Sequence, residues 1–371
     1  MKKLKIVSVV GARPNFMKIA PILREFQKYK DIDSVLVHTG QHYSGRMSDI
    51  FLKDLKIGRY IGLDIGAGAP IVQVKKIMAR FKKVLRREKP DLVIVVGDVN
   101  STLACALVAA KLRIRVAHVE AGLRSFDLSM PEEINRKFTD AVSDYLFVTE
   151  PSGLKNLRNE AIPDENIFFV GNVMIDSLVH SLGTARKRGT LARLGVKKGK
   201  YALLTLHRPG NVDDARPLAR IINMLGRMRG DVRVIYPVHP RSVKMLKRFG
   251  HWNRLRGLPG VIITEPLGYL DFLRLMIDAR FVLTDSGGIQ EETTYLGVPC
   301  FTLRANTERP VTISRGTNRL VGSDYNRVLR LINSLPSRRK RRRIKFWDGH
   351  AAARIVRILR DELEKARAAG V

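Results

Sequence analysis

The sequence predicts an α/β protein with two domains, each built on a parallel sheet. Short apolar, β-branched segments alternate with longer segments of helical periodicity, which is the order of repeated strand–helix–strand units. This alternation starts near the N-terminus and starts again after residue 171. The 371 residues also exceed the size of one ordinary domain and suit two.

The first series occupies the N-terminal half. Its expected strands are residues 5–10, 34–38, 92–96, 116–119 and 145–148, and its expected helices include residues 20–28, 73–87 and 103–111. Uninterrupted apolar strands of this kind are buried on both faces, as in a parallel sheet covered by helices. We therefore predict a first domain over residues 1–175.

The second series has expected strands at residues 201–205, 233–238, 261–264, 281–284 and 300–302. The segment 181–200 contains four glycines and is expected to connect the two series. A second domain is predicted over residues 176–349. The chain then ends in a segment of helical periodicity, predicted as a final helix over residues 350–371.

Composition limits the function classes. The formal net charge is +32, and part of it lies in the run SRRKRRRIK at residues 337–345. No aromatic residues are interleaved with basic ones on a strand, so we interpret the charge as solvated surface and expect no nucleic-acid partner. No apolar segment has the ~20 residues that span a bilayer, so no membrane partner is expected. Cys105 and Cys300 lie outside any metal or redox spacing, which favours a reduced, cytoplasmic protein.

Polar loops follow the strands of the first domain, where open parallel sheets bind ligands. The loop GARPNFMK places Arg13 and Lys18 near a helix N-terminus, where an anion would offset their unfavourable interaction with the helix dipole. Carboxylates that meet in one crevice can act as acid and base. The candidate residues of the first domain are Arg13, Lys18, Gln41, His42, Asp98, Glu120 and Glu132.

The strongest motif of the second domain is TDSGGIQEE at residues 284–292. Its glycines would let backbone amides approach a diphosphate at a helix N-terminus, and Glu292, one turn further on, could reach a ribose hydroxyl. Neither a G-x-G-x-x-G loop nor a metal-ligand spacing is present, so we expect no cofactor and no metal. The candidate residues here are His207, Arg208, His239, Ser286, Gly287, Gly288, Glu292 and Arg309.

Taken in order, these loops resemble the non-hydrolysing UDP-N-acetylglucosamine 2-epimerases. The matching segments are GARPNFMKIAPIL, TGQH, VVGDVNSTLA, HVEAGLRS, PEEINR, HRPGN, PVHPR, DSGGIQEE, LGVPCFTLR, NTERPVT and FWDGHAA. The resemblance implies two Rossmann-like domains in a glycosyltransferase-B-type arrangement, with the active site in the interdomain cleft. It also implies a final helix that packs on the first domain, and a homodimer.

The resemblance implies interconversion of UDP-N-acetylglucosamine and UDP-N-acetylmannosamine by elimination of UDP to 2-acetamidoglucal and re-addition. It assigns Asp98, Glu120, Glu132 and His207 to catalysis, and the remaining candidates to UDP-sugar binding. Gln41, Arg208 and His239 match positions linked to a second, activating substrate molecule. Ser44 does not match, and neither does the HRPGN loop in full, so activation by substrate stays open.

Three alternatives remain open. A glycosyltransferase-B-type UDP-sugar transferase would share the architecture and the nucleotide motif but would not need the three carboxylates of the first domain. A hydrolysing 2-epimerase, which releases N-acetylmannosamine and UDP, shares most of the loops. A nucleic-acid-binding protein would use the basic run and would show salt-dependent binding.

Overall fold

The computed structural model describes residues 3–40, 60–66, 68–228, 232–335 and 343–368. The chain divides into two compact units, Met1–His180 with Lys345–Val371, and Ser181–Ile344. The first change of unit falls inside helix α7 (Val173–Arg186), which continues without a break from one unit to the next. We call the units unit 1 and unit 2.

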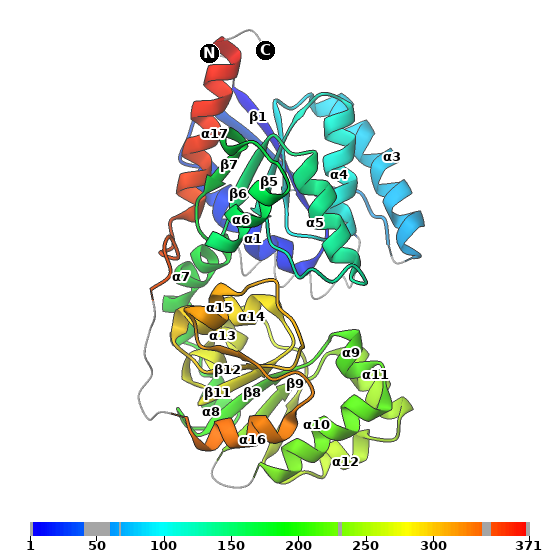
Figure 1. Ribbon diagram of the computed structural model, residues 1–371, viewed down its shortest axis with the longest axis vertical. Coiled ribbons are helices and arrows are strands. Elements are labelled where there is room, and N and C mark those ends of the chain that lie inside the picture. Colours follow the sequence, from blue (N-terminus) through cyan, green and yellow to red (C-terminus); the bar gives the residue numbers. More distant parts are fainter. Residues whose placement is uncertain (1–2, 41–59, 67, 229–231, 336–342, 369–371) are drawn as a thin grey trace. The chain divides into compact units, whose positions relative to one another are not determined.

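Unit 1 is built around a sheet in which every strand pairing is parallel (Figure 1). Within the described residues its strands are, in order across the sheet, β3 (Ile61–Gly62), β2 (Ile32–His38), β1 (Leu4–Val10), β4 (Leu92–Val96), β5 (Arg115–Ala121), β6 (Tyr145–Val148) and β7 (Ile167–Phe169). The order reverses at β1, so the loops after β1 and β4 flank the point where such sheets bind ligands.

Helices cover this sheet. They are α1 (Arg13–Phe26), α3 (Pro70–Glu88), α4 (Asn100–Lys111), α5 (Pro131–Ala141), α6 (Pro151–Asn159) and α7, with a 3₁₀ turn at Asp164–Asn166. Helix α1 begins seven residues before the start expected from the sequence, residue 20. Pro14 occupies its first turn, where a missing N–H costs nothing, so the motif GARPNFMK is itself the helix start.

The C-terminal helix α17 (Ala351–Ala368) packs against α1 of unit 1 (Figure 1). Its first two amides donate to the carboxylate of Asp176, Ala351 N to Oδ1 at 3.1 Å and Ala352 N to Oδ2 at 2.7 Å. Just before the helix, Trp347 Nε1 donates to the carbonyl of Thr149 at 3.0 Å. These contacts fix the returning chain on unit 1 through a capped helix N-terminus.

Unit 2 contains a second parallel sheet of the same kind (Figure 1). Among the described residues its strands are, in order, β10 (Val261–Thr264), β9 (Arg233–Pro237), β8 (Tyr201–Thr205), β11 (Phe281–Thr284), β12 (Cys300–Thr302) and β13 (Asn318–Leu320). This is the Rossmann order, with the reversal between β8 and β11. The prediction of two Rossmann-like α/β domains is confirmed.

The core of unit 2 is formed by apolar residues of the strands and of the amphipathic helices α10 and α16. In chain order the helices are α8 (Thr190–Arg193), α9 (Pro209–Val212), α10 (Ala215–Arg227), α11 (Pro240–Arg248), α12 (Trp252–Arg256), α13 (Tyr269–Asp278), α14 (Gly287–Leu296), α15 (Val311–Ser314) and α16 (Tyr325–Asn333). Helices α9, α11 and α14 each start shortly after a strand end, which places their N-termini at the edge where open parallel sheets generally bind ligands.

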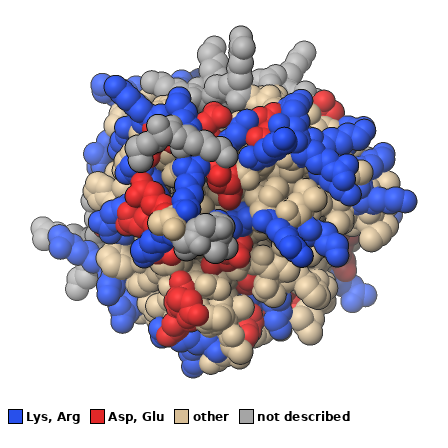
Figure 2. All heavy atoms as spheres, turned by 90° about the horizontal axis from the view of Figure 1, so that it is seen from above, with Lys and Arg blue, Asp and Glu red and all other residues tan. Residues whose placement is uncertain are grey.

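Basic side chains are spread over the face shown in Figure 2, and acidic side chains lie among them. Most of the basic run 337–345 lies outside the described residues. No helix in the described part of the chain is both long enough and apolar enough to cross a membrane.

Candidate functional site

In unit 1, the loops after β1, β4 and β5 bring several of the predicted residues together. Strand β1 pairs with β4 and β4 pairs with β5, so their carboxyl ends lie side by side. Asn15 holds two of these loops: its Oδ1 accepts from the amides of Gly11 and Ala12, and its Nδ2 donates to Val96 O at 2.9 Å. Asn15 was not among the predicted residues, yet its side chain shapes the loop of the GARPNFMK motif.

Glu120 and Lys18 form a buried ion pair in this region. Nζ of Lys18 donates to Oε2 of Glu120, and the two side chains are 7% and 4% exposed. Glu120 has φ of +76°, and the pairing of β5 with β6 shifts register between Val119 and Ala121. This irregularity changes the direction of the Glu120 side chain at the end of the strand. Backbone strain of this kind is common at functional sites.

The backbone at Gly97 is also specialised. Its φ is +70°, and a Cβ there would lie 2.6 Å from Nζ of Lys18 and 3.4 Å from Oε2 of Glu120. Only glycine therefore fits beside this ion pair without displacing it.

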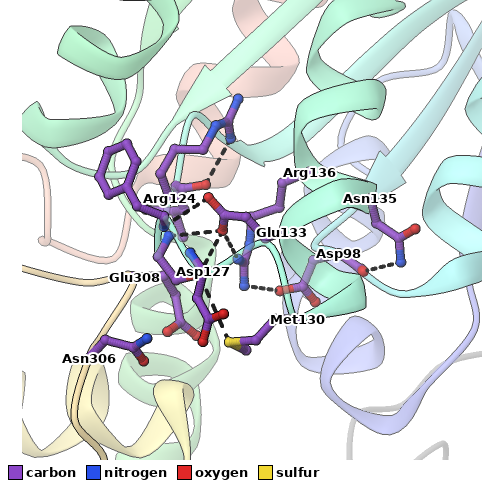
Figure 3. Close-up of polar contacts among 12 residues, drawn as sticks. Asp98, Arg124, Asp127, Met130, Glu133, Asn135, Arg136, Asn306 and Glu308 are labelled. Atoms are coloured by element: carbon purple, nitrogen blue, oxygen red, sulfur yellow. Dashed lines mark hydrogen bonds and ion pairs between the residues drawn. The ribbon is translucent and has the colours of Figure 1, made fainter.

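Asp98, the next residue, is held by helix α5 (Figure 3). Arg136 donates to Asp98 Oδ2 through Nη2 and to Glu133 Oε2 through Nη1, the latter at 2.8 Å, and its side chain is 2% exposed. Asn135 Nδ2 donates to the carbonyl of Asp98 at 2.9 Å. Arg136 thus bridges two carboxylates and keeps a positive charge against Asp98.

The PEEINR motif contains two acids with different surroundings. Glu133 is buried and accepts hydrogen bonds from Ser125 N at 2.8 Å, Ser125 Oγ at 2.9 Å and Phe126 N at 3.1 Å (Figure 3). Its role is to organise the loop before α5. Glu132 is only half-buried in the first turn of α5, and successive helix residues do not share a face. Glu132, rather than Glu133, therefore stays the candidate for contact with a substrate.

Behind Glu120 and Gly97 lies a buried charge network that the sequence did not indicate. His118 contacts Asp140 Oδ1 through Nδ1 at 2.6 Å and Gly97 O through Nε2 at 2.8 Å. Arg124 Nη2 donates to Asp140 Oδ2 at 2.7 Å and to Glu160 Oε2 at 2.6 Å. Burial acts to raise the pKa of Asp140, but the neighbouring His118 and Arg124 outweigh it and lower that pKa. The network ties the loop after β4 to β5.

The remaining first-domain candidates are less defined. Arg13 is the first residue of α1, so its backbone stands at the helix N-terminus as expected. Gln41 and His42 lie outside the described residues.

In unit 2, the loops after β8 and β11 meet at the switch point of the sheet. His207 Nδ1 lies 2.8 Å from Oδ1 of the fully buried Asp285. Oδ2 of Asp285 also accepts from the amides of His207 at 3.0 Å and Arg208 at 2.9 Å, and from Asn211 Nδ2 at 3.1 Å. Burial acts to raise the pKa of Asp285, but His207 and the other donors lower it overall. Asp285 belongs to the quoted DSGG motif, yet sequence reasoning gave it no role.

Two further predicted positions flank helix starts. Arg208 is the N-cap residue of α9 and is half-buried. His239 is the N-cap residue of α11, and its Nδ1 accepts from the amide of Arg241 at 3.2 Å. Each thus lies just beyond the carboxyl end of a strand of the unit 2 sheet.

The Ser-Gly-Gly turn begins α14 as predicted, with Ser286 as N-cap and Gly287 and Gly288 as the first helical residues. The first amides of a helix have no intrahelical partner and point along its axis, which suits an anion. A Cβ on Gly287 would lie 2.5 Å from Nη1 of Arg309. Arg309 is buried between Glu291, at 2.7 Å from its Nε, and Glu308, at 2.6 Å from its Nη1. Arg309 is therefore firmly anchored beside the turn.

Glu292 lies one turn along α14 and is buried. Burial raises its pKa to about 7, although a hydrogen bond from the Tyr269 hydroxyl to its Oε1, at 2.8 Å, acts in the opposite direction. Tyr269 is a partner that the sequence did not single out. Glu292 can thus exist in either protonation state near neutral pH.

Comparison with known proteins identifies the family of this chain. Residues 24–360 match the family model described as UDP-N-acetylglucosamine 2-epimerase. A UDP-N-acetylglucosamine 2-epimerase from Methanocaldococcus jannaschii is 42% identical over 362 residues, which cover 96% of this chain and 99% of that protein. A UDP-2,3-diacetamido-2,3-dideoxy-D-glucuronate 2-epimerase from Pseudomonas aeruginosa is 39% identical over 86% of this chain and 89% of its own length.

This chain is also similar to solved structures. The Methanocaldococcus jannaschii UDP-GlcNAc 2-epimerase in complex with UDP-GlcNAc and UDP has a TM-score of 0.89 at 43% identity, covering 96% of this chain and 99% of that one. The Neisseria meningitidis UDP-GlcNAc 2-epimerase bound to UDP-GlcNAc has a TM-score of 0.88 at 31% identity, covering 96% of this chain and all of that one. The chain therefore belongs to the UDP-N-acetylglucosamine 2-epimerase family.

Proposed function

We propose that this epimerase interconverts UDP-N-acetylglucosamine and UDP-N-acetylmannosamine without net hydrolysis, by elimination of UDP to 2-acetamidoglucal and re-addition. The observation that carries the proposal is the pair of cation-bound carboxylates in unit 1, Glu120 with Lys18 and Asp98 with Arg136. Both carboxylates lie at the carboxyl ends of the neighbouring strands β4 and β5, and carboxylates placed in this way can accept and donate protons in catalysis.

The chemistry requires such groups. The hydrogen on C2 of an N-acetylhexosamine is not acidic until the bond from C1 to the diphosphate begins to break. The C1–O electron pair then leaves with UDP, a base takes the C2 proton, and a C1–C2 double bond forms. Re-addition of UDP with proton delivery to the other face inverts C2, so acid–base groups are needed for both faces. Asp98, Glu120 and Glu132 are the proposed groups.

In unit 2, we propose that the N-terminus of α14 binds the diphosphate through backbone amides at Ser286, Gly287 and Gly288, and that Glu292 binds the ribose. Support comes from the helix N-terminus at a strand end and from the carboxylate of Glu292 one turn along. His207, whose ring is 44% exposed, is proposed to interact with the departing diphosphate. A cationic or donating imidazole would stabilise the charge that develops there.

The substrate assignment follows the relatives. The Methanocaldococcus jannaschii structure is in complex with UDP-GlcNAc and UDP, and that protein covers nearly all of this chain. The Pseudomonas aeruginosa relative acts, by its name, on a diacetamido uronate and is nearly as similar. We therefore propose UDP-N-acetylglucosamine as substrate and include the uronate sugar nucleotide as a competing substrate in the test.

The test is incubation with UDP-N-acetylglucosamine in D₂O, followed by product identification by NMR and mass spectrometry. We expect UDP-N-acetylmannosamine with deuterium at C2, and exchange of the bridging oxygen of UDP with the non-bridging oxygens of its β-phosphate. Accumulation of free N-acetylmannosamine and UDP would instead identify a hydrolysing enzyme. Retention of the original C2 hydrogen would overturn the elimination mechanism.

Two variants sharpen this test. Asp98→Asn and Glu120→Gln keep the size of each side chain and are expected to lower turnover by roughly 10²-fold or more. Asp164→Asn is the matched control, since Asp164 is an exposed carboxylate of the same unit whose ion pair with Arg158 is also exposed. The control is expected to keep wild-type turnover.

We also propose a cytoplasmic homodimer. The segment Leu4–Val10 forms the buried strand β1 between β2 and β4, and Cys105 and Cys300 are buried free thiols, as in a reducing compartment. The proposed assembly is a separate point: the homodimer is the assembly implied by the family resemblance. Light scattering over a range of protein concentrations tests it, and a mass equal to one chain throughout would contradict it.

A further inference from the structure

We propose that Asp285 is the positioning residue of His207: its buried carboxylate holds the ring so that Nδ1–H is used within the protein and Nε2 is presented to the departing diphosphate. The inference rests on the proposed function of His207 and adds a residue to which that function assigns no role.

The two residues are brought together by the switch point of the unit 2 sheet. Strands β8 and β11 are neighbours, and Thr205 is in register with Thr284. The hydroxyls of these two threonines lie 2.7 Å apart. Asp285 follows this last pair by one residue and His207 by two, and their side chains meet just beyond the sheet.

The surroundings of Asp285 determine which ring nitrogen of His207 carries the hydrogen. Its two carboxylate oxygens face nitrogen donors: the amides of His207 and Arg208, the side-chain amide of Asn211, and Nδ1 of His207 at 2.8 Å. An ionised carboxylate only accepts hydrogen bonds, so Nδ1 must carry the hydrogen. The lowered pKa of Asp285 agrees with this ionised state.

A ring whose Nδ1–H is fixed has one nitrogen left for chemistry. The neutral ring then offers Nε2 as an acceptor, and protonation at Nε2 gives an imidazolium whose charge is balanced by the Asp285 carboxylate. The ring is 44% exposed whereas Asp285 is fully buried, so Nε2 is on the accessible side of the pair. When the C1–O bond breaks and its electron pair leaves with the diphosphate, an imidazolium so held can stabilise the new negative charge.

The alternative is that Asp285 only anchors the loop that carries α9. The same carboxylate does accept two backbone amides of that loop, so a loss of activity alone would not separate the two roles. The tautomer of His207 separates them, because anchoring the loop places no demand on which ring nitrogen carries the proton.

The experiment uses the intact protein labelled with nitrogen-15 in its histidine rings, with His207 assigned by its disappearance in His207→Gln. In the wild type, the neutral ring is expected to be protonated at Nδ1. In Asp285→Asn, the single carbonyl oxygen is taken by the amides of His207 and Arg208, and the new NH₂ group faces Nδ1. His207 is then expected to switch to the Nε2–H tautomer, with a fall in kcat on the order of 10²-fold or more.

Asn211→Ala is the matched control, since it removes another donor to the same carboxylate and a bond to Leu303 O but leaves His207 Nδ1 untouched. It is expected to lower Tm by a few degrees and to keep the Nδ1–H tautomer. An Nε2–H tautomer in the wild type would overturn the proposal, and this measurement requires no variant of Asp285 to fold.

A double-mutant cycle separates this inference from the proposed function. If Asp285 acts through His207, Asp285→Asn should cost little further activity in a His207→Gln background. Full activity of His207→Gln would remove His207 from the mechanism but leave the tautomer result standing. An unchanged tautomer in Asp285→Asn would overturn the positioning role, whatever His207 does.

Discussion

Lys18 and Glu120 form a buried ion pair that packs against Gly97. The Lys18 side chain is 7% exposed and the Glu120 side chain 4%. A Cβ on Gly97 would lie 2.6 Å from the lysine nitrogen. The ion pair and the glycine come from three different strand–helix units of unit 1, so the site depends on the packing of the sheet and not on one loop.

Gly97→Ala should therefore impair catalysis more than stability. The methyl group would displace the Lys18 ammonium from Glu120, and we expect turnover to fall roughly 10²-fold or more. The left-handed backbone adds a stability cost of about 1–2 kcal/mol. Gly195→Ala is the matched control, because Gly195 has φ of +61° and no atoms within 4 Å of its Cβ position. It should have the same backbone cost with normal turnover; equal kinetic losses in the two variants would refute the explanation.

Arg136→Met should destabilise unit 1 strongly. The substitution keeps most of the side-chain volume but leaves Asp98 and the buried Glu133 without their shared cation. Removing one partner of a buried ion pair typically costs about 3–5 kcal/mol, and denaturant unfolding measures the difference. Arg158→Met, which breaks an exposed pair with Asp164, should leave the unfolding midpoint close to that of the wild type. Similar midpoints for the two variants would contradict the role given to Arg136.

The fold was largely predictable because its central strands are uninterrupted apolar runs. β4 and β11 were expected with their observed bounds. The strands β3, β7 and β13 were missed because they are short edge strands of two or three residues and are only partly buried, whereas the equally short β12 is fully buried and was expected. Apolar pattern and segment length alone could not have identified them.

The residues of the candidate site were likewise predictable only in part. Motifs identified residues such as Glu120 and Glu292 because strand ends and helix starts are local features. The partners of these residues were not predictable, because Arg136, Asp285 and Tyr269 act through contacts with another part of the chain. The order of strands across the sheet determines which loops meet, and a motif does not contain that order.

Gly288→Val should abolish UDP binding while leaving unit 2 folded. A branched side chain at the second residue of α14 would occupy the space that a diphosphate needs above the backbone amides. Isothermal titration calorimetry with UDP measures the effect, and circular dichroism verifies the fold. Gly183→Val, in α7 with no atoms within 4 Å of its Cβ position, is the control and should bind UDP normally. Unchanged affinity in Gly288→Val would remove the diphosphate from this turn.

Glu292 should make UDP affinity depend on pH near neutrality. Burial raises its pKa to about 7, Glu291 acts in the same direction, and the Tyr269 hydroxyl opposes them. If the ionised carboxylate accepts hydrogen bonds from the ribose, affinity for UDP should rise as the pH increases through 7. Glu292→Gln should bind UDP more weakly and lose this pH dependence. The exposed Glu165→Gln should behave like the wild type in calorimetric titrations at several pH values.

The same carboxyl group should affect stability with the opposite sign. A glutamate in an unfolded chain has its ordinary pKa of 4.5, whereas the folded pKa of Glu292 is about 7, so between these values the folded protein holds a proton that the unfolded chain has released. The contribution of Glu292 to the free energy of unfolding is therefore fully present below pH 4.5 and falls as pH rises through 7, by up to about 3 kcal/mol. Relative to Glu292→Gln, the wild type should lose stability across this range in denaturant unfolding. A constant difference between the two proteins would mean that Glu292 is ionised throughout, and its pH-dependent role in binding would fail with it.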